Sequence, residues 1–197
     1  ARRGDAGVES NARLTASTAV ILVVLLAVEG VTVLRIHALL TLHVFVGMLL
    51  VPLVAVKIGS TTWRFARYYR GNSAYRRKGP PPAVLRLLGP FVVATTVVMF
   101  ASGIVLLVGP ANWHSQLLFV HQASFVAWLV AMTAHVLGHA RDTVRLAPLD
   151  WARRNRNDVR GGTTRQAALV LSMIVGVVLA SVTIGQISHY LQGQRFR

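Results

Sequence analysis

Residues 38–58 read ALLTLHVFVGMLLVPLVAVKI, and this stretch decides the fold class. A helix needs roughly 20 mostly apolar residues to cross the hydrocarbon core of a bilayer, and this run has that length and character. Four further runs resemble it. The five predicted spans are Leu14–Ile36, Ala38–Ile58, Leu88–Val108, Gln116–Leu137 and Gln166–Ile187. The sequence therefore predicts an all-α membrane protein with five transmembrane helices.

The distribution of positive charge predicts the topology of these spans. The chain is 54% hydrophobic and carries a net charge of +15, which would suit a nucleic-acid-binding protein if it formed one surface. Lys and Arg instead gather between the spans: three precede the first span, seven lie in 59–87 and seven in 138–165. Only three lie in the other connection regions and the tail. By the positive-inside rule the N-terminus and these two loops are cytoplasmic and the C-terminus is external, so a nucleic-acid partner is not expected.

The connections predict how the spans are arranged. A tight turn around Arg35–His37 joins spans one and two, and Gly109–Ser115, with its Gly-Pro pair, joins spans three and four. Short connections place consecutive helices side by side and antiparallel. We therefore expect spans one to four to form an up-down-up-down bundle, with the fifth helix alongside, in one membrane domain over residues 1–197.

The two basic loops have two interpretations. The Arg- and aromatic-rich residues 63–70 are expected to continue span two as a helix whose side chains reach the lipid headgroups. Topology and lipid contact alone would account for both loops. The alternative is a docking surface for an acidic redox partner protein.

Histidines inside the apolar spans are the strongest functional signal. His43 and His121 each lie about six residues inside the predicted external end of a span, at one depth roughly 8–9 Å from that end. Two histidines that face each other across a helix bundle can ligate one haem iron from both sides. Gly47, one turn below His43, would leave room for the flat porphyrin. The alternative is that the two histidines form interhelical hydrogen bonds.

A second histidine on span four predicts an inner site without an obvious partner. His135 lies fourteen residues after His121, so it stays on the same face and suits a second haem. The inner halves of the other spans hold no histidine, and Lys57 takes the position fourteen residues after His43. Lys57 could ligate iron, pair with a haem propionate or extend to the headgroups. His139 is the other inner candidate, with an interfacial polar residue as its alternative.

Glu29 is the acidic residue inside a predicted span. An ionised carboxylate there needs a partner, and we expect Arg35 or His37 to provide it. Its functional interpretation is a proton acceptor from a quinol, and its alternative is a structural pair or a neutral acid. The chain has no cysteine, which excludes disulfides, thiolate haem ligands, iron–sulfur clusters and covalent haem attachment. No Ser/His/Asp or His-Glu-x-x-His arrangement suggests a hydrolase.

Two segments of the chain resemble a known family. They are His43-Val44-Phe45-Val46-Gly47, followed by Pro52, Lys57, Arg64 and Tyr68-Tyr69-Arg70, and Phe119-Val120-His121-Gln122-Ala123-Ser124-Phe125-Val126-Ala127-Trp128 running to His135 and His139. Together they resemble bacterial membrane cytochromes b of the cytochrome b561 and formate-dehydrogenase gamma-subunit type. The resemblance covers roughly residues 14–140.

The resemblance implies a four-helix core that holds haem b in the bacterial inner membrane. Its outer haem would lie between spans two and four, at His43 and His121, and an inner haem between spans one and four, at His135. Span one has Thr15, Ser17 and Thr18 in its inner part and no histidine, so the chain departs from the pattern there.

The leading functional hypothesis is an electron-transfer subunit of an oxidoreductase complex. It would carry electrons between the quinone pool and a redox partner through one or two haems. One rival is a cytochrome b561-type transmembrane reductase with its own substrate, which needs haem at both faces. The other rival is a haem-free structural or transport subunit.

Overall fold

The computed structural model describes the backbone of residues 3–79, 82–152 and 159–195, and the side chains of 5–79, 82–152 and 159–185. Every regular element in these ranges is helical. The elements are α1 (Arg3–Leu34), α2 (Ile36–Tyr69), α3 (Ser73–Lys78), α4 (Ala83–Val108), η1 (Ala111–Trp113), α5 (His114–Trp151) and α7 (Gly162–Arg195).

Five of these helices are long and apolar enough to cross a membrane, which confirms the predicted fold class. They are α1, α2, α4, α5 and α7. In the most apolar part of each helix only 17% to 28% of the residues are buried inside the protein. Most of the valine, leucine and isoleucine side chains therefore face outward, where only lipid can solvate them favourably. The chain is a multi-pass membrane protein.

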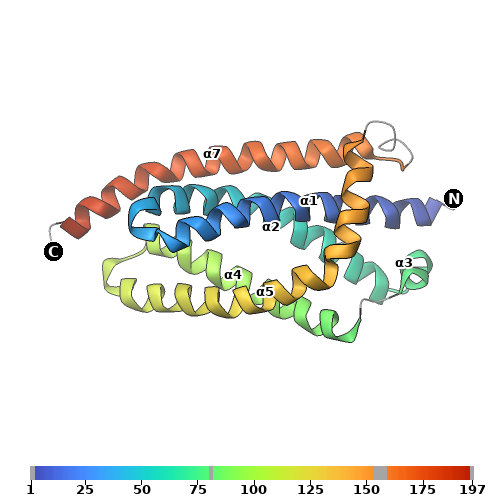
Figure 1. Ribbon diagram of the computed structural model, residues 1–197, viewed down its shortest axis with the longest axis horizontal. Helices are drawn as coiled ribbons and strands as arrows, with labels where there is room; N and C mark the ends of the chain where they lie inside the picture. The colour runs from blue at the N-terminus through green and yellow to red at the C-terminus, as the bar shows by residue number, and fades with distance from the viewer. Residues whose placement is uncertain (1–2, 80–81, 153–158, 196–197) are drawn as a thin grey trace.

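The helices run alternately in opposite directions, as the short connections predicted (Figure 1). α1 packs against α2 and α5, and α4 packs chiefly against α5. α2 and α5 therefore lie diagonally opposite each other in the bundle. α2 and α4 form one edge of the bundle but contact each other at few positions. The fifth spanning helix, α7, lies alongside the bundle and packs on α2.

The two turns at the end away from the basic residues, α1 to α2 and α4 to α5, have local causes. Arg35 separates α1 from α2, and Leu39 in the first turn of α2 has non-helical angles (φ −118°, ψ 19°), so α2 is kinked there. The backbone amide of Gly109 caps α4 on the carbonyl of Val105. Pro110 then turns the chain into the short helix η1. Because Ile36 already belongs to α2, the first span ends two residues earlier than predicted.

The helices extend well into the predicted cytoplasmic loops. α2 continues to Tyr69, as the Arg- and aromatic-rich stretch predicted. Residues 138–165 are not simply a loop, because α5 runs on to Trp151 and α7 begins at Gly162. Figure 1 shows the last part of α5 turning across α1. Beyond the hydrocarbon core, water can solvate polar side chains, so a helix can continue there. The apolar run therefore predicts the part of a helix that crosses the membrane but not the residue at which the helix ends.

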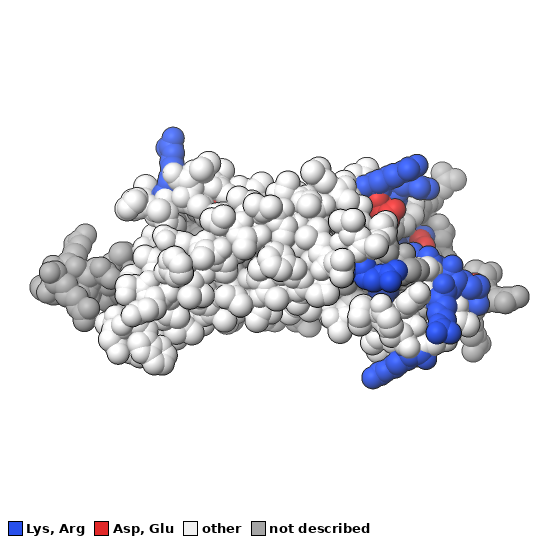
Figure 2. All heavy atoms as spheres, turned by 90° about the horizontal axis from the view of Figure 1, so that it is seen from below, with Lys and Arg blue, Asp and Glu red and all other residues white. Residues whose placement is uncertain are grey.

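Most of the basic residues lie at one end of this bundle. Figure 2 shows most of the blue side chains gathered at the N-terminal end and one at the opposite end, with a long white section between them. A buried ion pair lies at the same end: the Arg165 guanidinium donates to both carboxylate oxygens of Asp150, at 2.6 and 2.5 Å, and to the Ser10 hydroxyl at 2.9 Å. This contact joins the end of α5, the start of α7 and α1.

Candidate functional site

His43 and His121 meet inside the bundle, near the end opposite the basic residues. His43 lies on α2 and His121 on α5, the two helices that face each other diagonally. Their ring centroids are 6.3 Å apart and the ring planes are inclined by 85°. The structure thus brings together the two histidines that the sequence paired by depth.

The surroundings of His43 determine which of its ring nitrogens carries a proton. Nδ1 lies 2.9 Å from Oε1 of Glu29 and 3.2 Å from the hydroxyl of Thr32, both on α1. An ionised carboxylate can only accept, so with Glu29 ionised Nδ1–H of His43 is the donor. In the neutral ring the free lone pair is then on Nε2.

His121 has the same tautomer for a different reason. Its Nδ1 lies 2.9 Å from the backbone carbonyl oxygen of Met99 and 3.2 Å from the Ser102 hydroxyl, both on α4. The carbonyl also can only accept, so Nδ1–H donates here as well. Both histidines therefore have their available lone pair on Nε2, with Nδ1 held by a neighbouring helix.

This arrangement has the donor set of an axial bis-histidine pair. Two imidazole nitrogens that each lie about 2.0 Å from a shared metal bring the ring centres to about 6 Å from each other. The observed centroid separation of 6.3 Å agrees with that spacing. Among the described residues no group of three or more His, Cys, Asp or Glu side chains could hold a metal ion alone. A macrocycle that supplies its own equatorial nitrogens, as haem does, needs only two protein ligands.

The glycine that lies closest to the histidine pair is Gly103, and not Gly47 as the sequence suggested. A Cβ added to Gly47 would lie 3.6 Å from Oε1 of Glu29, which is ordinary contact, so this structure does not require glycine there. The role of Gly47 beside a porphyrin stays a prediction. At Gly103 on α4 a Cβ would lie 3.0 Å from Cε1 of His121. Sequence reasoning missed Gly103, whose only signal was the small pair Ser102-Gly103 in an apolar span.

Glu29 has a different partner from the two expected. Its carboxylate contacts His43 Nδ1 and lies 3.2 Å from the Thr32 hydroxyl. Both side chains of the ion pair are largely buried, with 15% of Glu29 and 22% of His43 exposed. α2 is kinked at Leu39, in its first turn. His43 follows one turn later and contacts Glu29 on α1.

The inner candidates form a looser group. The rings of His135 and His139 lie 4.7 Å apart, and Nδ1 of His135 is buried without a hydrogen-bond partner. Lys57 Nζ donates to the Thr15 carbonyl at 2.8 Å. Lys57 is thus held toward α1, and its role as an iron ligand stays a prediction. No second histidine faces His135 from another helix among the described residues.

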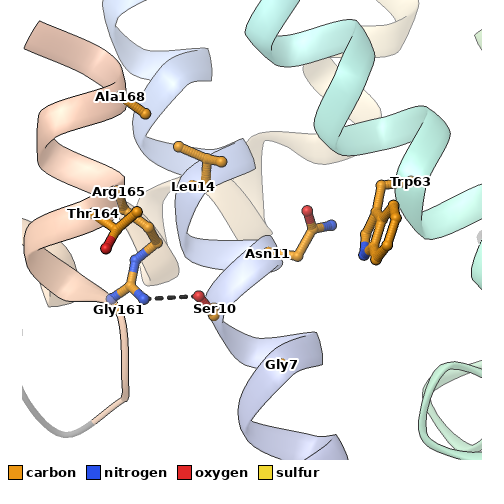
Figure 3. A pocket seen from close by; sticks show the side chains of 9 residues that line it. All are labelled: Gly7, Ser10, Asn11, Leu14, Trp63, Gly161, Thr164, Arg165 and Ala168. Carbon is orange, nitrogen blue, oxygen red and sulfur yellow. Dashed lines mark hydrogen bonds between the residues drawn. The ribbon is translucent and has the colours of Figure 1, made fainter. Parts of the chain in front are cut away.

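A pocket at the basic end lies apart from these histidines. It has a volume of about 390 Å³ and lies among α1, α2 and α7. Figure 3 shows Trp63 on one side, Arg165 and Thr164 on the other, and α1 between them. The Arg165 guanidinium is engaged with Asp150 and Ser10, so the pocket offers no vacant charge for a ligand.

The chain matches no protein-family model, no curated protein and no solved structure. The geometry of the paired histidines therefore carries the functional argument.

Proposed function

We propose that this protein is a membrane b-type cytochrome that transfers electrons between the quinone pool and a redox partner. Nε2 of His43 on α2 and Nε2 of His121 on α5 would hold the iron of haem b. The observation that carries the proposal is the pair of half-buried histidines whose Nδ1 atoms both have hydrogen-bond partners, at a centroid separation of 6.3 Å. Both rings do make interhelical hydrogen bonds, as the alternative expects, but these bonds use Nδ1 on each ring and leave Nε2 for a metal.

Haem, when bound, supplies one-electron redox chemistry. The chain's own residues hold and orient the ligands. Glu29 and Thr32 on α1 hold His43, while the Met99 carbonyl and Ser102 on α4 hold His121. Such partners fix the tautomer and the ring orientation of metal-bound histidines. The surrounding apolar side chains keep water away and so help to set the reduction potential.

The charge distribution supports the proposed orientation, and the partners are those that electron transfer in a membrane requires. The basic end faces the cytoplasm of a bacterial cell and the paired histidines lie near the external face. The electron donor or acceptor within the membrane is a quinol or quinone, and the redox partner is a protein subunit of a larger complex. The inner group at His135, His139 and Lys57 is the place for a second haem, although the structure provides His135 with no opposing histidine.

The test is a reduced-minus-oxidised absorption spectrum of the purified protein with haem quantified per chain. We expect b-type bands in the wild type and their loss in His43→Ala and in His121→Ala. His37→Ala is the matched control, because His37 is an exposed histidine at the external turn. If His135→Ala loses about one haem per chain and keeps the other, His135 holds a second, inner haem.

Two results would replace the proposal. Wild-type protein that binds no haem when it is produced with excess haem would favour the structural or transport subunit. Haem that persists in both His43→Ala and His121→Ala would place the ligands elsewhere.

A further inference from the structure

We infer that Glu29 is a positioning residue that lowers the reduction potential of the haem by holding Nδ1–H of His43 with a carboxylate. The inference rests on the proposed function, because it concerns the same ligand pair. It assigns to Glu29 a role different from the quinol proton acceptor expected from the sequence.

The first argument is the geometry around the carboxylate. Oε1 of Glu29 accepts from His43 Nδ1 at 2.9 Å, and Oε2 lies 3.2 Å from the Thr32 hydroxyl. Thr32 is fully buried, and its hydroxyl also donates to the Glu29 backbone carbonyl at 2.7 Å. The single proton of the Thr32 hydroxyl is shared between that carbonyl and Oε2, so the main contact of the carboxylate is Oε1 with His43, and Thr32 supports it from within α1.

The second argument is the asymmetry of the pair. His121 Nδ1 donates to an uncharged backbone carbonyl, whereas His43 Nδ1 donates to a carboxylate. A carboxylate draws the Nδ1 proton more strongly, which raises the basicity of Nε2. A more basic ligand and a nearby negative charge both favour the more positive, oxidised iron, so the potential falls.

The third argument is the cost of the carboxylate. An acidic side chain within a membrane span is unfavourable and needs a compensating interaction. In the structure His43 provides it, and the exposed fractions of 15% and 22% show that water does little to compensate. Helix packing alone would be served equally well by an apolar residue at this position.

The experiment is redox potentiometry of the haem-loaded protein at one fixed pH. Glu29→Gln keeps the size and an accepting oxygen but removes the charge, and we expect its potential to shift upward from the wild type. Glu29→Asp should restore part of the difference. Thr32→Val should give a smaller upward shift. Asp142→Asn is the matched control, because it removes the same charge from an exposed site on α5 near the basic end.

The outcomes separate the inference from the proposed function. Absence of haem in the wild type would defeat the proposed function itself. Haem with an unchanged potential in Glu29→Gln and Thr32→Val would overturn the inference and leave the cytochrome proposal standing. If Glu29→Gln does not retain haem, the test is the tautomer of His43, measured by nitrogen NMR in the haem-free wild type and in haem-free Thr32→Val. We expect the Nδ1–H tautomer in the wild type, and the opposite tautomer would refute the role.

Discussion

The oxygens that contact Nδ1 give the paired histidines their chemical character. A histidine on an apolar helix face could point either nitrogen inward and could carry its proton on either one. At His43 and His121 an acceptor on a neighbouring helix removes that ambiguity, because each Nδ1–H is directed at an oxygen 2.9 Å away. The Nε2 lone pairs of both rings remain for the proposed haem iron.

Gly103 provides a residue-scale prediction. In Gly103→Ala the added methyl carbon would lie 3.0 Å from Cε1 of His121. This contact is too short, so the His121 ring must shift. We expect haem affinity to fall roughly tenfold or more, as when a residue that supports a metal ligand is lost. Haem titration followed by absorbance measures this. Gly30→Ala is the control, since a Cβ there meets nothing within 4 Å, and equal losses in both variants would contradict the explanation.

Close backbone contact determines how α7 lies on the bundle. A Cβ at Gly176 would be 2.7 Å from the backbone oxygen of Leu49 on α2. Small residues allow transmembrane helices to approach this closely and to pack by van der Waals contact. Leu50 and Leu53 of α2 are almost completely buried in the same region of the core.

At the scale of helix pairs, we predict that Gly176→Val separates α7 from α2. Overpacking a tight contact typically costs about 1–3 kcal/mol, and backbone atoms cannot give way as a flexible side chain can. Unfolding in detergent micelles should show a lower midpoint. Gly59→Val on α2, where a Cβ meets no atom within 4 Å, should leave the midpoint nearly unchanged. An unchanged midpoint for Gly176→Val would show that the contact is not tight.

For the whole molecule, the buried charges at the basic end link three helices. Asp150 is 2% exposed and Arg165 is 4% exposed, and Arg13 on α1 lies 3.8 Å from the same carboxylate. A buried pair contributes little compared with an apolar substitute, but removing one partner leaves an uncompensated charge. The arrangement therefore holds the crossing end of α5 against α1 and α7.

We predict that Asp150→Asn destabilises the protein by about 3–5 kcal/mol, because Arg165 stays buried without its counter-charge. Thermal unfolding in detergent would measure this effect. Asp5→Asn is the control: its pair with Arg77 is about half exposed, and such pairs contribute at most about 1 kcal/mol. The double variant Asp150→Asn, Arg165→Met should recover part of the loss. Additive losses would show that the pair is not coupled.

Apolar length and residue spacing were enough to predict the five spans, the helical extension to Tyr69 and the shared depth of His43 and His121. These are local properties, since apolar length and residue spacing along a helix do not depend on neighbours. The tertiary structure decided that Glu29 and Thr32 hold His43, that Gly103 lies against His121, and that Asp150 pairs with Arg165. Each of these contacts depends on which helix faces meet and on how far each helix is rotated about its axis. A helix that is apolar all round has no polar face to indicate its rotation, so its sequence predicts neither.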